Sequence, residues 1–207
     1  RNNTELDSAV ITGVTKSVYT PRVLSGLGVI PRVVSNSRAI YRGKLTLDEA
    51  TKRLDQYWRP YHTRLQSLLS AAQASFGQAI LIDCHSMPRE ALDGTFRAGQ
   101  KRPEIIIGDR FGASASRYIV DGIQDILTQA GFTVSRNMPF AGAYITQHYG
   151  RPSQRQHAVQ LEIDRSLYMD EATLRPHAGF AQLCDQLDPV VAKLADLGRA
   201  CDRLAAE

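Results

Sequence analysis

The chain has 207 residues, 43% of them hydrophobic and 22% charged, and its formal net charge is +4 at pH 7. These values are typical of one globular domain of medium size with its own core. They exclude a membrane-spanning helix, because no run of about 18 apolar residues occurs. The positive charge comes mostly from single arginines spread along the chain, which favours small anionic substrates over nucleic acid as the partner.

Cysteine usage indicates a reducing compartment. The sequence has an odd number of cysteines, Cys84, Cys184 and Cys201, and no CxxC pair. Neither a disulfide framework nor a cysteine zinc site is therefore indicated. The polar opening sequence RNNTELD does not have the pattern of a secretory leader. We therefore expect reduced thiols, a cytoplasmic location and no membrane partner.

The first third of the chain is predicted to contain one strong helix. A short helical piece and a loop are expected within 8–27, followed by the β-branched run GVIPRVV at 28–34. Pro31 restricts that run to an edge strand or an extended loop. Thr46 is expected to begin the strong helix, because the sequence from Thr46 to Glu49 matches a capping box. Apolar residues follow at helical spacing, and Pro60 is expected to bend this helix.

The middle of the chain alternates between predicted strands and helices. Continuous apolar runs predict buried strands at 78–84 and 104–109. Ser114 is expected to cap a helix that ends at Gly131, and a short strand is predicted at 132–136.

Alternation then predicts a further strand at 157–165, with apolar residues on one side and polar residues on the other. The apolar side holds Val159, Leu161 and Ile163, and the polar side holds Gln160, Glu162 and Asp164. An amphipathic helix, or a pair of helices, is expected over 171–206. Strands that alternate with helices predict an α/β fold with a largely parallel sheet.

Chemically active side chains stand where the predicted strands end. LIDCHSMP, at 81–88, ends an apolar run in Asp, Cys, His and Ser. Ligands of open α/β sheets bind at the carboxyl ends of strands. Three interior strands would bring His85, Asp109 with Arg110, and Glu162 toward one such edge. Alternatives stay open: a structural histidine, a local cap at Asp109, and a Glu162 that faces solvent.

Two further features of the sequence bear on chemistry. Cys84 beside His85 resembles a nucleophile and its base, but neighbouring strand residues point to opposite faces, which excludes that dyad. The segment NMPFAGAYITQHYGRP, at 137–152, is rich in glycine, proline and aromatic residues. Such mixed chemistry is typical of a functional loop, and the alternative is a turn with surface aromatics.

Five ordered motifs resemble the N-formylglutamate amidohydrolase (deformylase) family. They are YWRPYH at 57–62, LIDCHSMP at 81–88, GDRFG at 108–112, AGAYITQHYGRP at 141–152 and QLEIDRSLYMDE at 160–171. The resemblance implies a single amidohydrolase domain over 1–207 with an α/β fold. It further implies a central mixed, largely parallel sheet flanked by helices, of the zinc-carboxypeptidase-like (phosphorylase/hydrolase-like) type. The implied reaction is the zinc-dependent hydrolysis of N-formyl-L-glutamate to formate and L-glutamate in histidine breakdown.

The resemblance also implies roles for single residues. His85 matches a zinc ligand, and Glu162 matches the general base. Arg1 resembles the end of an Asn-Arg pair that holds the substrate carboxylate. On this basis Asp83 is expected to orient His85. The remaining candidates bind substrate: Arg110 and Arg151 through its carboxylates, and Tyr144, His148 and Tyr149 through the developing oxyanion.

The chain departs from the family pattern at its beginning. Family members carry a histidine motif and an acidic zinc ligand near the N-terminus, whereas the first histidine here is His62. The resemblance therefore implies that the chain lacks an N-terminal segment, binds zinc poorly and turns over little substrate. Two alternatives are a zinc hydrolase of another N-acyl amino acid and a non-catalytic binding domain on the same fold. The sequence predicts no oligomeric state.

Overall fold

The computed structural model describes residues 1–15, 18–34, 37–96 and 101–204. The chain divides into two compact units, Arg1–Leu68 and Leu69–Glu207. The prediction that 1–207 form one domain stays a prediction. Within the described ranges, no helix has the length and apolar character needed to cross a membrane.

The first unit is built from short elements around a small apolar core. Strand β1 (Ile11–Thr12) pairs in parallel with β2 (Leu45–Thr46), and α1 (Pro21–Leu24) supplies the helical piece expected within 8–27. The run at 28–34 forms a loop of bends with one isolated bridge, from Val33 to Ala39, rather than an edge strand. The buried residues of this core are Val10, Ile11, Ile30 and Ala50.

The predicted capping box at Thr46 is confirmed. The Thr46 side chain accepts from the Glu49 N–H, and Glu49 accepts from the Thr46 N–H, at the start of α2 (Leu47–Arg53). A π-helical turn, Leu54–Trp58, then leads into α3 (Arg59–Phe76). The Arg59 N–H donates to the Leu54 carbonyl, and Pro60 has no N–H to continue an ordinary ladder. The bend expected at Pro60 stays a prediction, and the structure has a π-helical turn just before this residue.

A mixed four-stranded sheet forms the centre of the second unit. Its order is β3-β6-β4-β5, and the strands are β3 (Ala79–Met87), β4 (Ile105–Gly108), β5 (Val134–Arg136) and β6 (Gln156–Asp164). The pairs β3–β6 and β4–β5 are parallel, whereas β4–β6 is antiparallel. The predicted α/β fold with a mixed sheet is confirmed.

The arrangement of the strands differs from the prediction in two respects. Strand β3 lies at the edge of the described sheet, and β4 runs opposite to β3 and β6. Parallel neighbours need a long crossover, usually an α-helix. The described part of the connection from β3 to β4 contains only the 3-10 turn Arg89–Leu92. The three strands therefore do not send their carboxyl ends to one edge.

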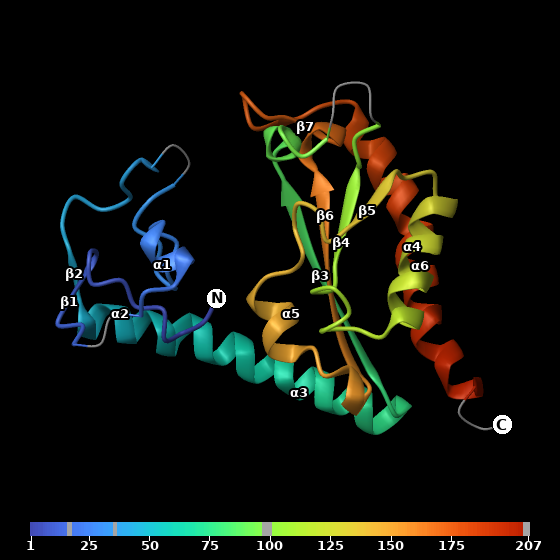
Figure 1. Cartoon of the computed structure of the whole chain (residues 1–207), viewed down its shortest axis with the longest axis horizontal. Helices are drawn as coiled ribbons and strands as arrows, with labels where there is room; N and C mark the ends of the chain where they lie inside the picture. Colours follow the sequence, from blue (N-terminus) through green and yellow to red (C-terminus); the bar gives the residue numbers. More distant parts are fainter. Residues whose placement is uncertain (16–17, 35–36, 97–100, 205–207) are drawn as a thin grey trace. The chain divides into compact units, whose positions relative to one another are not determined.

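Helices α4 (Arg117–Gln129) and α6 (Gly179–Leu204) cover one face of the sheet, and α5 (Tyr144–Tyr149) lies on the other (Figure 1). The cap of α4 is Ser116, not the predicted Ser114, because Ser114 is buried and its hydroxyl donates to the Ala158 carbonyl at 2.7 Å. Gly131 follows α4 with φ +93°, as expected of a helix end. Apolar residues of α4, α6, β4 and β6 form the main core.

The last predicted helix begins later than expected. Strands β7 (Met169–Asp170) and β8 (Arg175–Pro176) pair in an antiparallel hairpin, so the helix starts at Gly179 rather than at residue 171. It is a single helix that contains Pro189. Its predicted end at residue 206 lies outside the described residues. Two 3-10 turns, Pro152–Gln154 and Arg165–Leu167, flank β6.

Candidate active site

The register of β3 and β6 places four polar side chains on one face of the sheet. Asp83 lies opposite Gln160, and His85 lies opposite Glu162. Residues two apart on a strand share a face, and so do residues directly opposite in a pair. The alternate residues of β6, Val159 and Leu161, belong to the core under α4 and α6. The polar face is therefore the face that carries α5.

The His85 imidazole lies between two carboxylates. Its Nε2 is 3.1 Å from Asp83 Oδ2, and its Nδ1 is 3.7 Å from Glu162 Oε1. The predicted convergence of His85 and Glu162 is confirmed. The buried Asp83 Oδ2 has no aligned hydrogen-bond donor among the described residues, so its close contact with the His85 ring is electrostatic.

Burial and charge shift both groups. The neighbouring Asp83 carboxylate raises the pKa of His85, and this outweighs the lowering that partial burial causes. Burial raises the pKa of Glu162, against the opposing effects of His85 and of a hydrogen bond from Gln160. A carboxyl with a raised pKa is suited to take up and return a proton near neutral pH. The pair has the chemistry of an acid–base centre.

The backbone that leads into α5 closes one side of the polar face. The Ala143 N–H donates to Gln160 Oε1 at 2.9 Å. A Cβ at Gly108 would lie 2.6 Å from the Gly142 nitrogen, and Gly142 itself has φ +108°. Glycine is needed at both positions, the first for space and the second for its backbone conformation. These two residues allow the 141–143 backbone to approach the sheet closely.

Three of the predicted substrate-binding residues belong to α5. The rings of Tyr144 and His148 are stacked with centroids 5.0 Å apart, while Tyr149 is buried. Burial lowers the pKa of His148, and Arg151 adds to this effect. Tyr144 directly follows Ala143, whose N–H contacts Gln160 on the polar face. The predicted functional loop thus contains a short helix.

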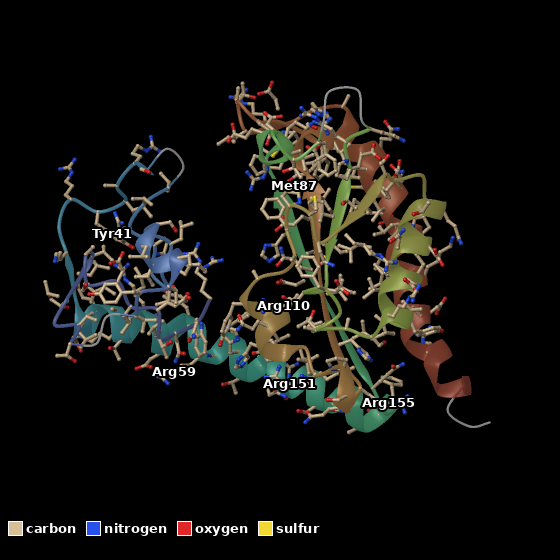
Figure 2. All side chains as sticks on the ribbon, in the orientation of Figure 1. Tyr41, Arg59, Met87, Arg110, Arg151 and Arg155 are labelled. Carbon is tan, nitrogen blue, oxygen red and sulfur yellow. The ribbon has the colours of Figure 1, made fainter. Side chains whose placement is uncertain are left out.

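The two predicted carboxylate-binding arginines of this unit lie beside opposite ends of α5 (Figure 2). Arg151 Nη1 donates to the carbonyls of Gln147 at 3.2 Å and Gly150 at 2.6 Å, so it caps the end of the helix. The Arg110 N–H donates to the Ala141 carbonyl ahead of the helix. Its guanidinium makes no hydrogen bond or ion pair within the described part of the chain, which leaves its donors for a ligand.

The predicted meeting of Asp109 and Arg110 with the carboxyl ends of β3 and β6 is wrong. Because β4 is antiparallel to β6, Gly108 lies opposite Gln160 in the middle of β6. Asp109 is engaged locally, where its Oδ1 accepts from Asn137 Nδ2 at 2.5 Å and its Oδ2 accepts from the Gly112 N–H at 3.1 Å. The alternative of a local cap is the one that fits Asp109.

Arg1 belongs to the first unit. Its Nη1 donates to the Gly28 carbonyl at 2.9 Å, and its own carbonyl accepts from Trp58 Nε1 at 2.7 Å. Burial lowers the pKa of the Arg1 guanidinium. Its role in holding a substrate carboxylate stays a prediction.

Cys84 does not pair with His85. The imidazole is engaged by carboxylates, and burial raises the pKa of the Cys84 thiol. A largely apolar cavity of about 350 Å³ is lined by Cys84, His85, Ser86, Ile163, Tyr168, Phe180, Leu183, Cys184 and Leu187. A thiol with a raised pKa is a poor nucleophile, in agreement with the exclusion of a dyad.

A zinc site with three protein ligands does not fit the residues that the structure describes. In those ranges no group of three or more His, Cys, Asp or Glu side chains could hold a metal ion. Both ring nitrogens of His85 also face carboxylates. Catalytic zinc is generally held by three protein side chains, so His85 alone is an insufficient donor set.

Two polar partners on this face were missed by the sequence analysis. Gln160 Nε2 donates to Glu162 Oε1 at 2.6 Å, although alternation alone had placed Gln160 beside Glu162. Asp164, fully buried, forms an ion pair with Arg89, whose N–H also donates to Glu171 at 3.0 Å. The sequence feature that could have indicated both contacts is the polar side of 157–165, because each of its three residues, Gln160, Glu162 and Asp164, has a polar partner.

Comparisons with known proteins agree with this geometry. Residues 1–169 match the family model for N-formylglutamate amidohydrolase. N-formylglutamate deformylases of Pseudomonas aeruginosa and Pseudomonas putida are each 32% identical to the chain, over 172 and 171 residues. Both matches cover 82% of this chain, and they span 63% and 60% of the length of those relatives.

A solved structure leads to the same assignment. The crystal structure of N-formylglutamate amidohydrolase from Ralstonia eutropha matches with a TM-score of 0.84 and 32% identity. The match covers 95% of this chain and 71% of that chain. Together with the family model, it confirms the resemblance of the five motifs. The chain belongs to the N-formylglutamate amidohydrolase family.

Proposed function

We propose that the protein hydrolyses N-formyl-L-glutamate to formate and L-glutamate at the polar face that carries His85 and Glu162. The observation that carries the proposal is the 3.7 Å contact between His85 Nδ1 and Glu162 Oε1. Both residues lie within the stretch that matches the family model. The names of the Pseudomonas relatives support the choice of substrate.

In this proposal Glu162 transfers the proton. It takes a proton from water, whose oxygen forms a bond to the formyl carbon. The carbon–nitrogen bond then breaks, and Glu162 returns the proton to the leaving amine. Burial, which raises the pKa of Glu162, suits it to both halves of this transfer. Positioned acid–base catalysis of this kind contributes about 100- to 10,000-fold to a rate.

Recognition of the substrate requires cations, because N-formyl-L-glutamate carries two carboxylates. Arg110 is half-buried, and its guanidinium has no ion pair among the residues described. A planar guanidinium can bind a carboxylate in two-point contact. We assign Arg110 to one carboxylate, while Arg1 and Arg151 stay candidates for the other.

Zinc dependence, which the family resemblance implies, is part of this proposal, with His85 as a ligand. The described residues do not supply a three-ligand site by themselves. A place in histidine breakdown and a cytoplasmic location are likewise proposed and follow from the resemblance and the cysteine usage.

A substrate panel tests the proposal. Release of the free amino acid is measured with N-formyl-L-glutamate, N-acetyl-L-glutamate, N-succinyl-L-glutamate and N-formyl-L-aspartate, in a form of the protein that shows hydrolysis. We expect the highest kcat/KM for N-formyl-L-glutamate. A higher value for another acyl group would support the alternative N-acyl amino acid hydrolase. Binding of these compounds without turnover in every form would support the binding domain.

A further inference from the structure

We propose that Gln160 is a positioning residue that fixes the Glu162 carboxylate and connects it to the start of α5. This inference rests on the proposed function, because it gives Gln160 a part in the reaction through Glu162. Gln160 is 3% exposed, and both of its side-chain polar atoms are engaged. Neither polar partner is an exposed side chain that could swing away.

The orientation of the Gln160 amide follows from its partners. The Ala143 backbone N–H can only donate, so the atom that it meets at 2.9 Å must be Gln160 Oε1. The amide nitrogen must then face the other way, where Nε2 donates to Glu162 Oε1 at 2.6 Å. A flipped amide would place a donor against a donor, and a bare oxygen against a carboxylate. One orientation is therefore selected.

Because of this contact, the two carboxylate oxygens of Glu162 have different surroundings. Oε1 accepts from Gln160 and is also the oxygen nearest to His85, at 3.7 Å. Oε2 has no hydrogen-bond or ion-pair partner in the described ranges. With Oε1 held, Oε2 is the oxygen left to take up a proton from water. Gln160 thereby sets which oxygen takes up the proton, without itself touching the reacting atoms.

The same side chain couples two parts of the site. Ala143 precedes Tyr144, the first residue of α5, and Gly142 allows this backbone to approach the sheet. The path from Ala143 through Gln160 to Glu162 consists of two hydrogen bonds, a part-buried one of 2.9 Å and a buried one of 2.6 Å. A shift of the backbone ahead of α5 is therefore expected to move the carboxylate, because buried hydrogen bonds are costly to leave unmade.

A double-mutant cycle on stability tests the contact independently of any activity. The variants Gln160→Met, Glu162→Met and the double variant are made in this chain, and their unfolding equilibria are measured. Gln160→Met leaves the Glu162 carboxylate without its donor, whereas the double variant removes both groups. We expect a coupling of about tenfold or more in the unfolding equilibrium constant. Additive effects would overturn the proposal.

Gln156→Met is the matched control. Gln156 lies on the same strand and face, is buried, and donates from Nε2 to the Tyr149 carbonyl at 2.7 Å. It is six residues from Glu162, roughly 20 Å along a strand. Its cycle with Glu162→Met is expected to be additive. Equal coupling in both cycles would show a general loss of the strand and would also count against the proposal.

A kinetic cycle then tests the role in the reaction, in a form of the protein that releases formate. Gln160→Met is expected to lower kcat by about 10- to 100-fold with KM changed less than about threefold. In the Glu162→Gln background the same substitution should have no further effect on kcat, because it acts through Glu162. An unchanged kcat, or an equal loss in both backgrounds, would overturn the positioning role. If no form releases formate, the proposed function fails, while the stability cycle still decides the contact.

Discussion

At the residue scale, the polar face is stabilised by contacts between its buried polar groups and partners of complementary chemistry. Glu162 and Asp164 are both buried, and a buried charge without a partner is costly. Gln160 and His85 contact the first, and Arg89 contacts the second. His85 is the more open member, with 42% of its side chain exposed, so in the proposed reaction the substrate reaches the pair from the His85 side.

Arginine substitutions separate substrate binding from structure at this scale. In a form of the protein that shows hydrolysis, Arg110→Ala and Arg151→Ala are each expected to raise KM or lower kcat/KM by about 10- to 100-fold, because a charge-assisted contact is lost. Arg151→Ala should also lower Tm, since its guanidinium caps the α5 carbonyls. Arg117→Ala, at a largely exposed position on α4, is the control and should match the wild type. Unchanged kinetics in both variants would remove the two arginines from the site.

At the element scale, the position of α5 depends on how closely its leading segment approaches β4. In Gly108→Ala, the new Cβ would meet the Gly142 nitrogen at 2.6 Å, and backbone cannot move away cheaply. We expect a loss of about 1–3 kcal/mol in the free energy of unfolding. Gly198→Ala, in α6 with only an ordinary contact at 3.9 Å, is the control and should be neutral or stabilising. Equal stability of both variants would show that the approach is not tight.

The start of α4 is expected to depend on pH through His157. Its Nδ1 accepts from the N–H of Ser116, the cap of α4, and burial lowers the pKa of His157, with Arg155 adding to this. The unfolded chain therefore takes up this proton at a higher pH than the folded protein does. Stability should be fully present above about pH 6.5 and decrease as pH falls below it. Tm measured from about pH 8 to 5 should fall less in His157→Gln; parallel curves would contradict this.

Elements with local signals could be predicted from the sequence. Each of these signals depends only on residues close together in the chain. Examples are the Thr46 capping box, the apolar run at 104–109 and the alternation of 157–165. The direction of β4 could not be predicted, because it depends on a connection whose described part contains no crossover helix. The cap of α4 was misplaced by two residues because Ser114 is used by β6 instead.

The same distinction holds for the site. His85 and Glu162 were predicted because their side chains have chemistry of their own and stand in matched motifs. Gln160 was not, because a neutral amide gains its role only when Ala143, from another segment, fixes its orientation. Asp109 was misassigned because one partner, Gly112, lies in the turn that follows it, while the other, Asn137, is brought to it from the end of β5 by the fold.

At the scale of the whole molecule, the chain consists of two compact units, and the paired acid–base groups belong to the second. The chain spans 63% of the length of the Pseudomonas aeruginosa relative. The activity of the whole protein is therefore a proposal that rests on this second unit and on family membership.

The 207-residue chain by itself is expected to bind zinc weakly. The described residues bring no group of three ligands together, and zinc affinity comes largely from several preorganised ligands. Elemental analysis after dialysis should find well below one equivalent of zinc, and release of glutamate should be slight. A full equivalent of zinc would contradict this, and Asp83, His148 and Glu162 would then be the first ligands to test beside His85.

The rate of formate release by Glu162→Gln tests most directly whether the polar face of β6 is the hydrolytic centre. The substituted amide keeps the shape of Glu162 and still accepts from Gln160, but it cannot take up a proton. In a form of the protein that hydrolyses N-formyl-L-glutamate, kcat should fall about 100- to 10,000-fold, with KM changed less than about threefold. Glu90→Gln, at an exposed position, should keep the wild-type rate. A wild-type rate in Glu162→Gln would contradict the assignment of the centre to this face.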